Sequence, residues 1–91
     1  MASLRTDMIG AVWISTAYRT TYIGALGRDV GYYEIIVWEY DHTENKVGKI
    51  LYMCDSGSEI KYARKKHEKV VRAFRYLEYR KRRNGYEKRN N

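Results

Sequence analysis

Residues 32–40 read Tyr-Tyr-Glu-Ile-Ile-Val-Trp-Glu-Tyr and decide the fold of this chain. β-Branched and aromatic side chains dominate the stretch, which is typical of a β-strand. Successive side chains of a strand point to opposite faces of its sheet, and both faces are apolar here. The first face would carry Ile36 and Trp38, and the second Tyr33, Ile35 and Val37. A strand that is apolar on both faces is predicted to lie in the centre of a sheet.

Two flanking segments predict the neighbours of this strand. Residues 8–22 are rich in Val, Ile, Thr, Tyr and Trp, and one alternate set of them is the more apolar. Residues 41–46 have the composition of a turn, and residues 49–54 form a third short strand. Because short connections join antiparallel neighbours, the sequence predicts a three-stranded antiparallel meander.

A long helix is predicted after the strands. Ser56 and Glu59 have the spacing of a capping box, in which each side chain bonds the other residue's backbone amide. Apolar residues then recur at spacings of three and four, which defines one helical stripe. The stripe consists of Ile60, Ala63, His67, Val70, Val71, Phe74 and Leu77. Gly85 should end the helix, since glycine adopts the left-handed conformation of a helix stop.

The predicted fold class is therefore α+β, a βββα arrangement with one long C-terminal helix packed on one face of the sheet. Residues 1–91 form a single domain, and 84–91 a frayed basic tail. A helix over 58–83 would be about 39 Å long at 1.5 Å per residue. A three-stranded sheet cannot cover that length, so the turns beyond Leu77 should project or pack on another molecule.

Positive charge is concentrated in the last third of the chain. Residues 61–91 hold thirteen Lys and Arg against three Glu, whereas residues 1–60 hold five basic and eight acidic side chains. A local surplus of this kind attracts nucleic acid or an acidic protein surface. Tyrosines are interleaved with the cations, and this combination both binds phosphates and stacks on bases, although it is also common in protein interfaces.

The sequence thus predicts a binding surface on the helix for nucleic acid or a nucleoprotein, or for an acidic host protein. The helix end around Leu77 is a third possibility, as the seam of a homodimer. A solvated helix face with local ion pairs is the plainest alternative, since Glu68–Arg72 and Glu78–Arg82 have the i,i+4 spacing. The predicted binding residues are Lys61, Arg64, Lys65, Arg72, Arg75, Tyr76, Tyr79, Arg80, Arg82 and Arg83.

Few side chains could serve in catalysis or metal binding, and the sequence predicts neither an enzyme nor a cofactor. Asp41, His42, Cys54 and His67 lack the closely spaced pairs of a zinc site. A catalytic pair of Cys54 and His67 is conceivable, but nothing supplies an oxyanion hole. His67 lies on the apolar stripe and is better interpreted as a core or sheet-facing histidine.

Several short segments resemble a group of small phage proteins of unknown function. Residues 33–38 (Tyr-Glu-Ile-Ile-Val-Trp) resemble their YETMVF-type strand, residues 12–16 their first strand, and Ala63-x-x-x-His67-x-x-Val70-Val71 their helix. This chain has Lys66 where that pattern has Gly. The resemblance implies a phage accessory protein and carries no activity. A double-stranded-RNA-binding domain is a weaker likeness, because its first helix and its Gly-Pro-x-His loop are missing.

The cysteine count and the distribution of apolar residues predict the cellular compartment of the protein. The single cysteine, Cys54, cannot form an internal disulfide, and the N-terminal residues lack the pattern of a signal peptide. No apolar stretch approaches the roughly 20 residues that cross a bilayer. Together these observations predict a non-enzymatic phage protein of the host cytoplasm, either nucleic-acid binding or an anti-defence inhibitor of a host protein, with no membrane partner.

Overall fold

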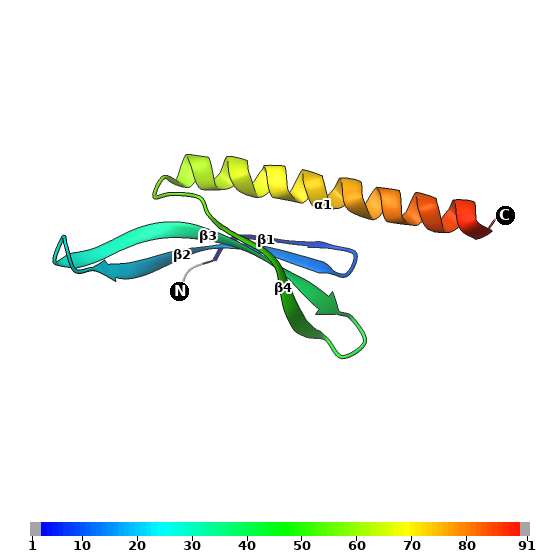
Figure 1. Cartoon of the computed structure of the whole chain (residues 1–91), viewed down its shortest axis with the longest axis horizontal. Coiled ribbons are helices and arrows are strands. Elements are labelled where there is room, and N and C mark those ends of the chain that lie inside the picture. The colour runs from blue at the N-terminus through cyan, green and yellow to red at the C-terminus, as the bar shows by residue number, and fades with distance from the viewer. Residues whose placement is uncertain (1–2, 90–91) are drawn as a thin grey trace.

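The computed structural model describes the backbone of residues 3–89 and the side chains of residues 3–83. Four strands and one helix follow in the order β1 (Ser3–Ile9), β2 (Val12–Ile23), β3 (Arg28–Asp41), β4 (Lys46–Asp55) and α1 (Ile60–Arg89). The strands form one antiparallel sheet in the order β1-β2-β3-β4, with α1 across one face (Figure 1). The predicted α+β class, meander and C-terminal helix are confirmed, but the sheet has four strands and not three.

The additional strand is β1, which the sequence analysis merged in part with β2. The predicted strand over 8–22 is divided by a turn at Gly10 and Ala11, after which Val12 pairs back with Ile9. Gly10 has a φ of +54°, which glycine adopts without the steric cost of a Cβ. The turn cannot be recognised in the sequence, because apolar residues stand on both sides of Gly10. β1 cannot be recognised either, because Ser3–Asp7 has a polar composition.

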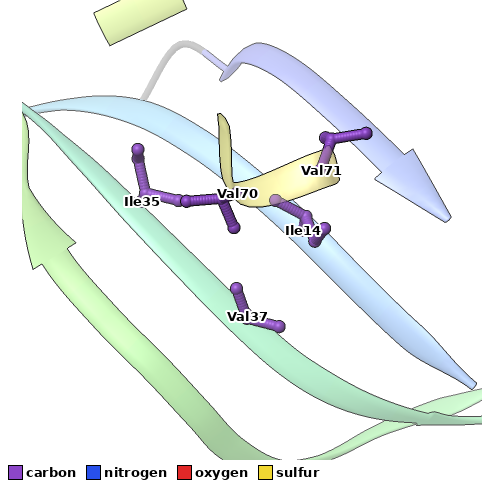
Figure 2. Close-up of a cluster of buried hydrophobic side chains, with 5 residues drawn as sticks. All are labelled: Ile14, Ile35, Val37, Val70 and Val71. Carbon is purple, nitrogen blue, oxygen red and sulfur yellow. The ribbon is translucent and has the colours of Figure 1, made fainter. Parts of the chain in front are cut away.

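The hydrophobic core lies between α1 and the middle of the sheet. Ile14 is paired with Val37 in neighbouring strands, and both side chains are fully buried. Ile35, Val70 and Val71 complete the cluster (Figure 2). Burying a side chain of this size contributes about 1.5–3 kcal/mol, so these five residues fix how the helix lies on the sheet.

The helix begins at Ile60, two residues after the predicted Ser58, and the capping box does not form. Ser56 remains attached to the sheet, because its hydroxyl and its backbone N–H both donate to the Tyr33 carbonyl, at 3.2 and 2.9 Å. The chain then leaves the sheet at Gly57, whose φ is +77°. The predicted stop at Gly85 is also wrong, since α1 continues to Arg89.

The helix continues through Gly85 because the penalty there is small. Glycine in a helix interior costs only about 1 kcal/mol relative to alanine, and beyond its neighbours Asn84 and Tyr86 the flanking Arg, Glu and Lys residues are good helix formers. The 30 residues of α1 give a length of about 45 Å. Fraying of residues 84–91 stays a prediction, and residues 90–91 lie outside those that the structure describes.

The predicted apolar stripe is confirmed in its middle and wrong at its ends. Ala63, His67 and Val71 are fully buried, whereas Ile60 is 44% exposed and Leu77 56% exposed. Figure 1 accounts for the exposure at the C-terminal end, because α1 is offset along the sheet and runs past the β1–β2 and β3–β4 turns. The last turns of α1 project past the sheet as predicted, but the first turn beyond Leu77 does not, because the Glu78 side chain lies beside Gly10 of the β1–β2 turn. None of the described helical segments is long and apolar enough to cross a membrane.

Candidate binding surface and the buried histidine network

All ten predicted binding residues lie on α1, and each of them is exposed. Tyr76 and Tyr79 are both 58% exposed. At 100° per residue, the ten point away from the stripe that packs on the sheet, or to its flanks. We call this set the basic surface: Lys61, Arg64, Lys65, Arg72, Arg75, Tyr76, Tyr79, Arg80, Arg82 and Arg83.

Part of the basic surface forms one continuous ridge. Residues three, four or seven apart share a helix face, and one such series follows the solvent side of α1. The ridge consists of Lys61, Lys65, Arg72, Tyr76, Tyr79 and Arg83. It extends for about 33 Å at 1.5 Å per residue, and two tyrosines interrupt its cations. The secondary structure thus gathers residues that are spread over the last third of the sequence into one straight row.

Acidic neighbours neutralise only a small part of this surface. Between Ile60 and Arg83, eleven Lys and Arg face two glutamates. Arg72 Nε lies 3.9 Å from Glu68 Oε1, and Arg82 Nε lies 3.4 Å from Glu78 Oε1, so both predicted i,i+4 ion pairs are confirmed. Glu68 is shared further, because Arg5 on β1 donates to it at 2.7 Å. The cations therefore remain in clear excess.

The charge state of Glu68 follows from these neighbours. The hydrogen bond from Arg5 lowers the pKa of the Glu68 carboxyl, desolvation opposes that change, and the charges of Arg5, Arg72 and Arg75 lower it further. Glu68 is consequently ionised at neutral pH. It links β1 to the helix and offsets part of the surplus at the middle of the basic surface.

His67 is the centre of a polar network beneath α1. Its side chain is fully buried, with Nδ1 at 2.6 Å from the Thr16 hydroxyl and Nε2 at 2.7 Å from an Asp7 carboxylate oxygen. Arg5 Nε donates to the same Asp7 oxygen at 2.8 Å. A carboxylate can only accept, so Nε2 carries a proton and donates it to Asp7. The prediction that His67 is a satisfied, sheet-facing histidine is confirmed.

Asp7 is held in its charged form by the same contacts. Partial burial raises the pKa of this carboxyl, but the hydrogen bonds from His67 and Arg5 together outweigh burial and lower the pKa below its usual value. The Arg5 pKa is raised in turn, chiefly by its hydrogen bond to Glu68. The network thus connects the first strand with the helix through three charged groups and one buried imidazole.

Thr16, His67 and Asp7 stand in the order of a nucleophile, a base and an orienting carboxylate. Thr16 has no exposed surface, however, because α1 lies over it. A substrate could reach this hydroxyl only if the helix moved away. The arrangement therefore serves to position α1 on the sheet. Arg5, Asp7 and Thr16 could not be identified from the sequence, since only the pairing of β1 with β2 brings them together beside the helix.

The other chemistry-bearing residues are scattered. His42 Nε2 lies 2.6 Å from the Gly10 carbonyl oxygen, which ties the β3–β4 turn to the β1–β2 turn. Cys54 packs against the core opposite Ile35, and it is not hydrogen-bonded to His67, whose two ring nitrogens are engaged elsewhere. Within the described part of the chain, no three His, Cys, Asp or Glu side chains converge as metal ligands would.

Comparison of the chain with family models, with curated proteins and with solved structures finds no match in any of the three.

Proposed function

We propose that this is a non-enzymatic phage accessory protein that binds nucleic acid or a nucleoprotein in the host cytoplasm through the basic surface of α1. The observation that carries the proposal is the straight ridge of cations and tyrosines on the solvent side of the helix. The resemblance of residues 33–38 and of the Ala63–Val71 pattern to small phage proteins supports the origin and the accessory role.

The dimensions of the ridge suit a nucleic-acid backbone. Its length of about 33 Å is close to one turn of B-form DNA, which is about 34–36 Å. A rigid helix can therefore present several cations to phosphates within one turn without further ordering of its backbone. Tyr76 and Tyr79, both more than half exposed at 58%, are placed to stack on unpaired bases. These features support backbone contact with little sequence preference.

The test is a charge-reversal series measured against salt. Lys61→Glu and Lys65→Glu on the ridge, together with Arg75→Glu on the basic surface beside it, should leave the fold intact, because all three side chains are exposed. Each lost phosphate contact should flatten the slope of log K against log[salt] by about 0.9 on duplex DNA or 0.7 on a single strand. Arg72 is left unchanged, since its removal would also alter the Glu68 ion pair.

A matched control carries the same change of charge on the sheet. Arg28→Glu, Lys46→Glu and Lys49→Glu replace three exposed cations of β3 and β4, outside the basic surface. This control should bind nearly as well as the wild-type protein and keep its salt slope. Equal losses in the two triple variants would show that net charge alone drives binding. Absence of wild-type affinity for DNA and RNA at about 50 mM salt would refute the nucleic-acid proposal.

The second candidate is an anti-defence type inhibitor that binds an acidic surface of a host protein. Leu77 favours it, because this apolar side chain is 56% exposed between Tyr76 and Glu78 and would form a hydrophobic centre within a basic rim. A pull-down from host lysate with and without nuclease separates the candidates. A single host protein that is retained after nuclease treatment and lost with Leu77→Ala would favour the inhibitor.

A further inference from the structure

The sheet has a second apolar face, on the side away from α1. Strand alternation places alternate residues of β1 to β4 there, and the pairings Met8 with Trp13, Trp13 with Trp38, and Ile36 with Met53 join them across the sheet. We call this the open face: Met8, Trp13, Ile36, Trp38, Ile50 and Met53. Nothing in the described part of the chain covers it, as Figure 1 shows.

The open face exposes apolar surface that water does not solvate well. Met8, Ile50 and Met53 are 47%, 52% and 55% exposed, Trp13 and Trp38 are partly buried, and Ile36 in the centre is 6% exposed. Between them the rings of Trp13 and Trp38 lie against each other, with their centroids 5.7 Å apart. Contiguous apolar patches of this kind mark interaction sites in soluble proteins. β3 is apolar on both faces along its centre, as expected of a strand that is covered on both sides, and α1 covers only one.

We propose that a second copy of this chain covers the open face, so that two sheets pack face to face with the helices outside. The distribution of charge favours the open face over the basic surface as the contact between two copies. The basic surface of one copy repels that of another, whereas the open face carries no charge at its centre. The next row of this face holds Glu34 with Asp55 on the neighbouring strand. Arg19 Nε lies 2.6 Å from Glu34 Oε1, a charge contact without hydrogen-bond geometry, and offsets part of that row.

The size of the open face also fits a dimer. Four strands at about 4.8 Å spacing and about ten residues at 3.3 Å give roughly 600 Å² in flat projection. Side chains that stand above the sheet enlarge the accessible area towards the ~800 Å² per partner of a standard interface. A two-fold axis brings the same apolar residues together from both copies, which needs no complementary charge. The two sheets would then lie about 10 Å apart, as in a β-sandwich.

Sedimentation equilibrium tests the dimer directly. The wild-type protein should show twice the monomer mass at micromolar concentration, and raised salt should not dissociate it. Ile50→Glu with Met53→Glu should give a monomer, with the dimer Kd raised by about a hundredfold or more, because each substitution buries an unpaired charge at the interface. Both side chains are more than half exposed in one copy, so the variant should keep its circular-dichroism spectrum.

Leu77→Glu is the matched control, since Leu77 is as exposed as Met53, at 56% against 55%, but lies on the helix. It should leave the dimer intact. Tryptophan emission gives a second reading, because both tryptophans of the chain lie on the open face. Dilution should shift the wild-type emission to the red, and this measurement decides the matter if the double variant does not fold. A monomeric wild-type protein, or a dimer that Leu77→Glu alone dissociates, would overturn the proposal.

Discussion

The two sides of α1 differ in how many of their side chains find partners within the molecule. On the side that faces the sheet, Val71 is fully buried and both ring nitrogens of His67 are hydrogen-bonded. Away from the sheet the charges are unbalanced, because eleven Lys and Arg face two glutamates between Ile60 and Arg83. The first side accounts for the fold, and the second leaves charge for a partner to neutralise. Adjacent residues of one helix can therefore have separate roles.

Adjacent substitutions on the two sides should give the largest contrast. Val71→Asp would bury an unpaired carboxylate in the core, which costs several kcal/mol out of a total stability of about 5–15 kcal/mol. We expect this variant not to fold. Arg72→Asp changes a side chain that is 76% exposed and should change stability by about 1 kcal/mol or less. Thermal melting followed by circular dichroism compares them, and similar melting temperatures would contradict the helix register.

Removal of one network charge should have an intermediate effect that depends on pH. Asp7→Asn loses charged hydrogen bonds with His67 and Arg5, and should destabilise the fold by about 1–3 kcal/mol at pH 7. The Asp7 pKa is lowered by folding, so its contribution is present above the unfolded pKa of about 3.9 and disappears as the pH falls through the lower folded pKa.

The wild-type and Asp7→Asn melting curves should consequently converge at acidic pH. Asp29→Asn is the control, because Asp29 is exposed at the start of β3. It should follow the wild-type curve throughout. A constant difference between wild type and Asp7→Asn from pH 7 to pH 2 would mean that packing, and not charge, explains the loss.

Truncation of Phe74 should have a smaller effect than its place in the apolar stripe predicts. A fully buried phenylalanine costs about 3–5 kcal/mol on replacement by alanine. Phe74 is only partly buried at the edge of the core, so we expect Phe74→Ala to cost about 1–3 kcal/mol. Leu77→Ala, one turn further on, should stay within about 0.5 kcal/mol in the monomer. Chemical denaturation measures both, and equal losses would show that the sheet extends its support to Leu77.

Removal of metal ions by a chelator should have no effect on stability or binding. The His67 nitrogens are engaged with Thr16 and Asp7, and His42 Nε2 contacts the Gly10 carbonyl, so these imidazoles need no metal to complete their contacts. EDTA should leave the melting temperature and any nucleic-acid affinity unchanged. Stoichiometric zinc in the purified protein, measured by elemental analysis, would contradict this expectation.

Local patterns in the sequence predicted most of the fold. The apolar spacing of Ala63, His67, Val70 and Val71 identified the buried side of α1, and the composition of residues 32–40 identified the central strand. β1 was not predicted, because its polar residues do not have the apolar alternation of a strand. They form contacts with the helix instead. The end of α1 escaped because Gly85 is only weakly unfavourable within a strong helix.

The candidate site shows a similar division. The exposed side of a helix follows from spacing alone, so the residues of the basic surface could be placed there from the sequence. The pairing of Asp7 with His67 could not be predicted, because sixty residues separate them and only the completed sheet aligns them. Likewise, the outward position of Leu77 depends on where the sheet ends, which the helix sequence does not encode.

The contact between Asp7 and His67 also implies an order of assembly. The turns between β2, β3 and β4 close short loops, whereas this contact closes a loop of sixty residues and has the larger entropic cost. On a ribosome, β1 emerges first yet must wait for the helix to be synthesised before its carboxylate finds the imidazole. Long-range contacts of this kind slow folding. β1 can pair with β2 early, through the short turn at Gly10, but its contact with His67 should form last, when the helix docks.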